Sequence, residues 1–314
     1  MDQLTFSEAE YNVKKRKTRR EKFLDQMNEL IPWKQMEDKI RRYYPKDGNG
    51  RKAYPLIVML RIHCLQLFYN LSDPAMEDAL YEIESMRRFA GLSLSGAIPD
   101  ETTILKFRHL LEKHKLGEAL FSLINKYLAK QGLKLQEGTI MDATIISAPT
   151  STKNQSGKRD PEMHQVKKGN EWHFGMKMHI GTDDAIGCIH SITSTAANEH
   201  EITCADKLLH GKEKCVWGDA GYIGVDKREE HAQRKVEWQI AQRPGKIARL
   251  SDQDVIRQTE KMKAQVRAKV EHAFLYIKKI FGYSKVRYRG LAKNHNRLCL
   301  LSGFYNLIKW HRLA

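Results

Sequence analysis

The sequence lacks any run of about 18 uncharged apolar residues, the length that a membrane-spanning helix needs. Its longest apolar stretch, residues 55–71, contains Arg61 and His63. The first residues begin with acids and include no apolar core of a secretory signal. We therefore expect no membrane association and a cytoplasmic protein.

Cysteine is scarce and is not arranged in pairs. The five cysteines stand at positions 64, 188, 204, 215 and 299, and none forms a C-x-x-C motif. The odd number and the wide spacing exclude a regular disulfide framework and disfavour structural zinc. We interpret them as buried, reduced thiols. Internal repeats and low-complexity tracts are also missing.

Acidic residues are few toward the end of the chain. The 314 residues carry 54 Lys and Arg against 38 Asp and Glu, a net charge of +16. Counting by segment gives +6 for residues 1–136 (24 basic, 18 acidic), −3 for 137–242 (13 and 16) and +13 for 243–314 (17 and 4). A surplus concentrated in this way predicts a polyanionic partner, of which nucleic acid is the usual one.

Residues 1–136 are predicted to be all helical. Phe23, Met27 and Leu30 have helical spacing behind a basic run. That run is either a solvated helix face or an arm that contacts DNA phosphates. Its basic residues are Lys14, Lys15, Arg16, Lys17, Arg19 and Arg20.

Four further helices are expected in this part. They cover about 54–71, 74–89, 101–114 and 116–131, with Ser72 or Asp73 as the N-cap of the second. The segment 74–114 fits a DNA-binding helix-turn-helix, but two packed core helices have the same pattern.

After Gly138 the composition becomes typical of strands. Residues 139–146 predict a buried strand, 150–170 a polar loop, and 172–180 a strand with apolar and polar faces. Its polar face would carry Lys177 and two ordinary surface histidines, His173 and His179. Residues 181–187 predict a hairpin turn that includes Asp183 and Asp184, and 188–195 predict the returning strand.

The remaining elements alternate between helix and strand. Helices are expected at about 199–210, 224–233, 252–281 and 294–312, and strands at 215–219 and 236–241. The fold class is therefore mixed α/β, an antiparallel hairpin with parallel additions, preceded by the all-helical region.

Two acids occupy places where a functional site is expected. Asp142 lies within an apolar strand, where a charge is costly unless it meets a partner or a cation. Asp219 ends another strand and precedes a small-residue turn. Carboxylates at the ends of adjacent strands can share divalent cations, which prefer oxygen ligands.

A third acid is indicated by helical geometry. At 100° per residue, Arg267, Glu271 and Lys278 fall on one edge of the apolar stripe of the helix 252–281. Glu271 could then lean toward the strand ends. The alternative is a surface ion pair between Arg267 and Glu271 with an unrelated lysine.

These motifs resemble a known family. Asp-Ala-Thr at 142–144, Asp-Ala-Gly-Tyr at 219–222 and Arg-x3-Glu-x6-Lys at 267–278 are similar to the three boxes of DDE transposases of bacterial insertion sequences. The similarity is closest to the insertion-sequence-five family and covers nearly the whole chain. Ala264 stands where that family often has Tyr.

The resemblance implies a ribonuclease-H-like fold in which Asp142, Asp219 and Glu271 bind two Mg²⁺ ions, for which Mn²⁺ can substitute. Two metals roughly 3.5–4 Å apart would activate the attacking hydroxyl and stabilise the leaving oxygen. Arg267 and Lys278 would hold phosphates beside them. Further predicted contacts to double-stranded DNA are Lys177, Lys279, Lys285, Arg287 and Arg289.

The function expected is that of a DNA transposase. Residues 1–136 would bind terminal inverted repeats, and residues 137–314 would cut the strand and join its 3′-hydroxyl to target DNA. A homodimer on DNA is expected because the reaction uses paired ends. We also expect the protein to be associated with the bacterial nucleoid. A metal-dependent nuclease of the same fold and an inactive, transposase-derived DNA-binding protein are the alternatives. The segment His200-Glu201-x-x-Cys204 is not a zinc protease motif, because Cys replaces the second His.

Overall fold

The computed structural model describes residues 11, 13–46, 52–133, 135, 137–248 and 253–313. Among these residues, no helix combines the length and the apolar character needed to cross a membrane. The N-terminal part is helical, as predicted, and its elements are α2 (Arg19–Leu30), α3 (Trp33–Arg41), α4 (Leu56–Tyr69), α5 (Asp73–Glu82), α6 (Glu84–Ala90), α7 (Glu101–Lys113) and α8 (Leu116–Lys130).

The helix predicted over 74–89 is in fact two helices. Ser72 caps α5 as expected, but the chain extends at Ile83 (φ −111°, ψ 99°) before α6 begins. The Arg87 guanidinium donates to the carbonyls of Leu80 and Tyr81 at 2.8 and 2.6 Å, which satisfies the end of α5. The segment 74–114 therefore holds three helices, α5 to α7, where the simple helix-turn-helix pattern needs two.

A mixed sheet follows the helices, as predicted. Antiparallel pairing joins β1 to β3 and β3 to both β2 and β4, while β5 runs parallel to β1 and β6 parallel to β5. The strands are β1 (Gly138–Ser147), β2 (His164–Lys168), β3 (Glu171–Asp183), β4 (Ile189–Ala196), β5 (Cys215–Gly218) and β6 (Glu237–Ile240).

Three connections differ from the prediction. The polar segment 150–170 contains β2, which pairs with the start of β3. Residues 199–210 form a 3₁₀ turn (Glu201–Cys204) and the short α9 (Ala205–Leu208). Residues 224–233 form 3₁₀ turns in place of a helix: Gly224 is left-handed (φ 91°), and Val225 packs into a small cluster with Tyr222 and Met141.

Strand β3 is covered on both faces from Gly175 to Asp183, so the predicted solvent-facing polar side is wrong there. The chain after β4 returns over this strand, and the Leu208 carbonyl lies 2.2 Å from where a Cβ on Gly181 would be. His179 is therefore fully buried, and burial lowers its pKa to about 4. The turn predicted for Asp183 is confirmed, since its Oδ1 accepts from the amides of Ala185 and Ile186.

The cysteines are free thiols, as expected. Cys64, Cys188, Cys204 and Cys299 are buried, and Cys215 is half-buried. Burial raises the pKa of each of these thiols, so they are held in the neutral form.

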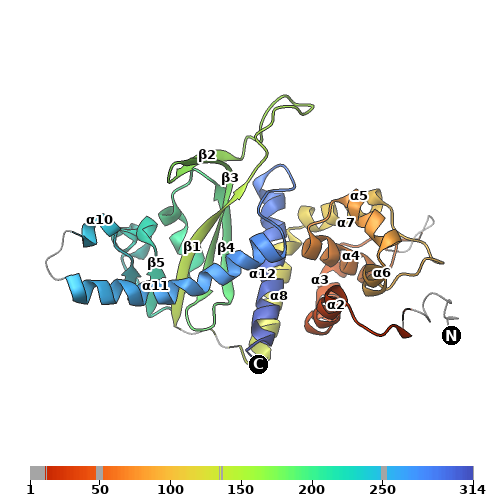
Figure 1. The fold of residues 1–314 in the computed structure, drawn as a ribbon, viewed down its shortest axis with the longest axis horizontal. Helices are drawn as coiled ribbons and strands as arrows, with labels where there is room; N and C mark the ends of the chain where they lie inside the picture. The colour runs from red at the N-terminus through yellow and green to blue at the C-terminus, as the bar shows by residue number, and fades with distance from the viewer. Residues whose placement is uncertain are drawn as a thin grey trace.

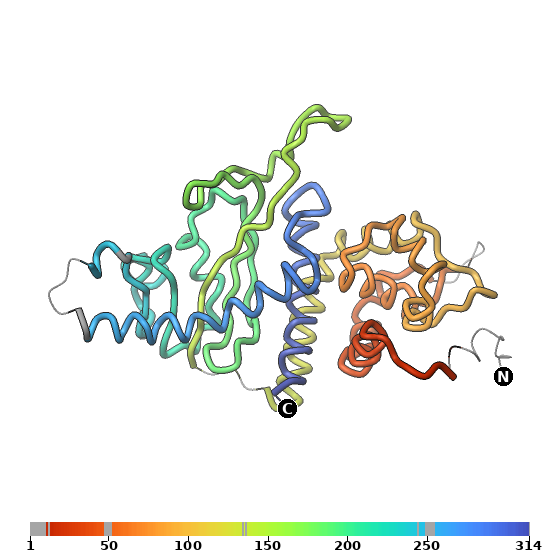
Figure 2. Tube along the Cα trace, viewed as in Figure 1, coloured from red at the N-terminus to blue at the C-terminus, as the bar shows by residue number. Residues whose placement is uncertain are grey.

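Two long C-terminal helices complete the molecule. Helix α11 (Gln253–Leu275) continues as one π turn at Tyr276–Ile280 and crosses the sheet over β1 and β5, next to the short α10 (Pro244–Ile247) (Figure 1). Helix α12 (Leu291–His311) lies beside α8, between the sheet and the N-terminal helices (Figure 2). It begins three residues before the predicted start, residue 294.

Close contacts hold α12 against α8. The Asn296 Oδ1 accepts from the Gly117 amide at 2.6 Å, and a Cβ on Gly117 would lie 2.2 Å from the Asn296 carbonyl. At the other end, a Cβ on Gly303 would lie 2.8 Å from Ile124. Glycine at these two positions allows the two helices to approach closely.

The same helix holds the β3–β4 hairpin through polar side chains. Asn306 accepts from the Ile189 amide at 2.8 Å and donates to the Ile189 carbonyl at 2.6 Å. The Tyr305 hydroxyl donates to the Gly187 carbonyl at 2.9 Å. The Asn306 side chain thus bonds both the amide and the carbonyl of Ile189 at the start of β4, as the backbone of a neighbouring strand would.

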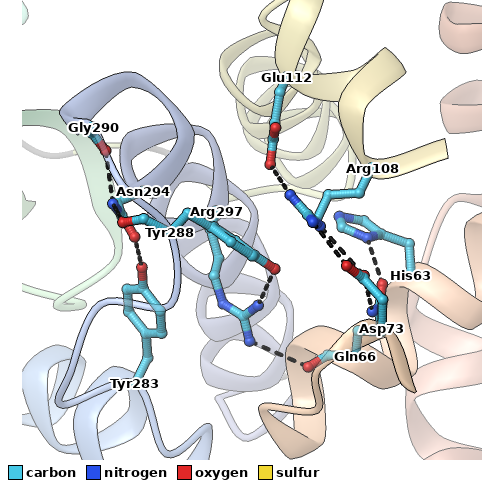
Figure 3. Close-up of polar contacts among 10 residues, drawn as sticks. All are labelled: His63, Gln66, Asp73, Arg108, Glu112, Tyr283, Tyr288, Gly290, Asn294 and Arg297. Atoms are coloured by element: carbon cyan, nitrogen blue, oxygen red, sulfur yellow. Dashed lines mark hydrogen bonds and ion pairs between the residues drawn. The ribbon is translucent and has the colours of Figure 1, made fainter. Parts of the chain in front are cut away.

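A third set of contacts ties the N-terminal helices to the C-terminal segment (Figure 3). Arg108 on α7 pairs with Asp73 on α5 at 2.8 Å and stacks on Tyr288, 4.1 Å from the ring centre. Arg297 on α12 donates to the Tyr288 hydroxyl at 3.1 Å and to the Gln66 carbonyl at 3.2 Å. Burial alone would raise the pKa of Asp73, but hydrogen bonds from Arg108 and Gln66 outweigh it and lower that pKa.

Asn306→Leu should lower the free energy of unfolding by roughly 1–3 kcal/mol, because it leaves the buried Ile189 amide without its side-chain acceptor and the Ile189 carbonyl with only the 3.3 Å contact from Asn125. Denaturant unfolding followed by circular dichroism measures this. Asn28→Leu, at an exposed position of α2, is the control and should change stability by less than about 0.5 kcal/mol. Equal effects of the two substitutions would contradict the pairing role of Asn306.

His63 should make the protein sensitive to acid. It is buried on α4, and burial together with the positive charge of Arg297 lowers its pKa to about 3. Between about pH 6.5 and pH 3 the unfolded chain binds a proton that the folded protein does not, so stability falls as the pH falls. His63→Gln should reduce that slope by up to about 1.4 kcal/mol per pH unit. Denaturation at pH 7 and pH 5 tests this; the exposed His164→Gln should leave the slope unchanged.

Candidate active site

The candidate site lies at the point where β1 and β5 stop pairing with each other. The two parallel strands pair from Gly138–Cys215 to Ile140–Trp217. Asp142 lies two residues beyond this last pair on one chain segment, and Asp219 two residues beyond it on the other. Asp219 caps the 3₁₀ turn Ala220–Tyr222 by accepting from the Gly221 amide at 2.8 Å. The two predicted carboxylates are therefore brought together where the β1–β5 pairing stops, Asp142 within β1 and Asp219 just after β5.

A third carboxylate joins them from a different element than predicted. Glu201, at the start of the 3₁₀ turn after β4, forms with Asp142 and Asp219 a group whose ligand oxygens all lie within 4.8 Å of one another. Sequence reasoning missed Glu201, because the only pattern considered around it was a zinc motif that it does not complete.

Lys177 forms an ion pair with Glu201. Its Nζ is 3.3 Å from Glu201 Oε1 and donates to the Glu199 carbonyl at 2.8 Å. The lysine is only 9% exposed. The structure thus places this predicted DNA contact inside the acidic site, as the ion-pair partner of Glu201.

Burial governs the electrostatics of the group. It raises the pKa of Asp142 to about 7, with further contributions from the negative charges of Asp219 and Glu201, while Arg267 acts in the opposite direction. Burial and the same three carboxylates raise the pKa of the Tyr222 hydroxyl well above its ordinary value. That hydroxyl is fully buried and has no hydrogen-bond partner within the described structure.

Helix α11 carries the third sequence motif over the strand ends. Arg267 is close enough to Asp142 to affect its pKa, and Lys278 donates to Thr144 Oγ1 at 3.0 Å. Burial lowers the pKa of Lys278, as do the nearby charges of Lys168 and Lys279, against the influence of Glu271. Glu271 itself is exposed on this helix and is not a member of the three-carboxylate group.

The N-terminal basic run is largely exposed. Lys14 pairs with Glu21, Lys17 pairs with Asp25 at 2.7 Å, and Arg20 lies over the Tyr69 ring. The exposed members of the run also include Lys15, Arg16 and Arg19.

The C-terminal basic residues surround a pocket between the β1–β2 loop and the segment before α12. Arg287 donates to Asn70 Oδ1 at 3.0 Å, and Arg289 donates to Ser156 Oγ at 2.8 Å. Lys279 and Lys285 are exposed near this segment. The basic residues that line the pocket are Lys153, Lys158, Arg159, Arg287 and Arg289.

Comparison with known families agrees with this geometry. Residues 11–110 match a transposase domain (DUF772), and residues 134–307, more than half of the chain, match the transposase DDE domain. The chain belongs to the DDE transposases. No solved structure matches it.

In this transposase the carboxylates fit the divalent metals that the family uses. Asp142, Asp219 and Glu201 offer hard oxygen ligands, and the Tyr222 hydroxyl, which has no partner among the described residues, would accept a hydrogen bond from water bound to a cation. Lys177 and Arg267 offset only part of the negative charge of the three acids. A bound cation would therefore relieve repulsion that the protein alone leaves in place.

Gly221→Ala should weaken divalent-cation binding while largely preserving stability. A Cβ there would lie 2.9 Å from Asp219 Oδ1 and 3.0 Å from Glu201 Oε2, so these carboxylates must move. Both atoms are at the ends of side chains, which can shift at little cost. Mn²⁺ titration and thermal unfolding separate the two effects. Gly245→Ala, which meets nothing within 4 Å, is the control; equal Mn²⁺ affinity in both variants would contradict the prediction.

Proposed function

We propose that this DDE transposase belongs to the insertion-sequence-five family and moves DNA by two-metal strand cleavage and strand transfer. The observation that carries the proposal is the meeting of Asp142 and Asp219 beyond the last β1–β5 pair, within the matched DDE domain. The antiparallel β4–β3–β1 run, continued by parallel β5 and β6, supports a ribonuclease-H-like catalytic domain.

In this proposal Asp142, Asp219 and Glu271 hold two Mg²⁺ ions, or Mn²⁺ in their place. When bound, these cations supply an activated hydroxyl nucleophile and stabilisation of the leaving oxygen. Arg267, beside Asp142, and Lys278, held by Thr144, orient the phosphate of the strand to be cut. Glu271 lies on the same helix, and it is proposed as the third ligand on the strength of its place in the Arg-x3-Glu-x6-Lys motif.

The division of labour follows the two family matches. Residues 1–136 bind the terminal inverted repeats, and residues 137–314 carry out the chemistry. The matched ranges leave α8 between them, and α8 packs along α12 of the second matched range. This connection supports delivery of a bound DNA end to the acidic site of the same chain or of its dimer partner.

The basic residues supply the phosphate contacts. The proposed DNA path runs over the exposed arm at 14–20 and the pocket of Arg287 and Arg289. Lys153 and Lys158, which the sequence analysis did not name as DNA contacts, line the same pocket. If six to ten such groups meet phosphates, affinity falls by ~10³–10⁵ between roughly 50 and 200 mM salt.

The decisive test is cleavage and joining of labelled DNA that carries the ends flanking the gene, with Mg²⁺. Asp142→Asn, Asp219→Asn and Glu271→Gln should each lower both activities at least ~100-fold, because each removes a ligand charge, while DNA binding is retained. Glu229→Gln, at an exposed position of the same matched domain, is the control.

Three outcomes would count against the proposal. Cleavage without joining of a pre-cut end would indicate the nuclease of the same fold. End binding with no Mg²⁺-dependent activity would indicate an inactive DNA-binding descendant. Full activity in Glu271→Gln would remove that residue from the metal site.

A further inference from the structure

The proposed function leaves Glu201 without a role, although it is part of the acidic group. Its oxygens lie within 4.8 Å of ligand oxygens of both Asp142 and Asp219. The close approach depends on Gly221, since a side chain there would collide with both Asp219 and Glu201. A small residue is therefore placed where two carboxylates must come together.

The surroundings of Glu201 point to a ligand and not only to an ion pair. Lys177 holds one oxygen, Oε1, at 3.3 Å, while the other, Oε2, is the one beside Gly221 and Asp219. The Tyr222 hydroxyl, fully buried and without a partner in the described structure, lies near the same three acids. If Lys177 and Glu201 formed only a structural ion pair, the negative charges of Asp142 and Asp219 would remain only partly neutralised. The Tyr222 hydroxyl would also remain without a hydrogen-bond partner among the described residues.

We propose that Glu201 is a further ligand of the divalent cation held by Asp142 and Asp219, and that Lys177 neutralises its carboxylate until the cation arrives. The inference rests on the proposed function for the presence of that cation. It assigns the first metal site to β1, β5 and the turn after β4. Glu271 on α11 is then free to complete the site for the second cation.

Mn²⁺ binding to the full-length, DNA-free protein tests the proposal, with free Mn²⁺ counted by electron paramagnetic resonance. Glu201→Gln should weaken binding at least ~10-fold, since it removes a charged ligand. Glu199→Gln, two residues away and exposed, makes the same charge change and should bind Mn²⁺ as the wild type does. Lys177→Met should bind Mn²⁺ at least as tightly as the wild type, because it removes a competing cation.

The outcomes separate this inference from the proposed function. Unchanged affinity in Glu201→Gln, with loss in Asp142→Asn, would overturn the role of Glu201 and leave the transposase site intact. Unchanged affinity in Asp142→Asn and Asp219→Asn as well would overturn both. Equal weakening by Lys177→Met and Glu201→Gln would show a structural pair and overturn the ligand role.

A second experiment uses only the wild-type protein, so its result does not depend on whether the variants fold. Fe²⁺ bound in place of Mn²⁺, with ascorbate and peroxide, cuts the backbone near the metal. Breaks at about 142, 201 and 219 are expected. Breaks near 142 and 219 with none in the turn 201–204 would overturn the proposal.

Discussion

The structure depends on burying α12 on every side. Almost every residue from Asn294 to Ile308 is buried, which a helix at a protein surface does not require. One side meets α8, another meets the β3–β4 hairpin through Tyr305 and Asn306, and Arg297 reaches α4. Because one helix serves all three partners, the helical region and the sheet share a continuous core from Leu24 to Ile308.

This shared core also holds the catalytic elements in place. The π turn at Tyr276–Ile280 joins α11 to the segment that leads into α12, and Phe281 packs with Phe68 of α4. Helix α11 is thereby fixed over β1 and β5, with Arg267 near Asp142 and Lys278 on Thr144. The site itself exists because β1 and β5 stop pairing after Ile140 and Trp217, which leaves room for a carboxylate within β1 and another just after β5.

Much of the candidate site was predictable because its residues carry local signals. Asp142 interrupts an apolar strand, Asp219 precedes Gly221 in a tight turn, and helical periodicity marks the edge that carries Arg267. Glu201 had no such signal: it is an acid in a short polar connection, and only the path of that connection brings it to the other two acids. The burial of Lys177 and His179 was missed for the same reason, since alternation along β3 does not reveal what covers each face.

The sequence by itself determined the division into a helical part and a mixed α/β part, the placement of Asp142 within a strand and of Asp219 just after one, the concentration of positive charge after residue 242, and the likeness to transposases. These follow from periodicity, composition and motifs, which act over a few residues. The tertiary structure alone decided that Glu201 and Lys177 enter the acidic site, that Glu271 stands outside the three-carboxylate group, and that α12 joins both parts. Such contacts join residues tens to hundreds of positions apart, and only the packed core sets those distances.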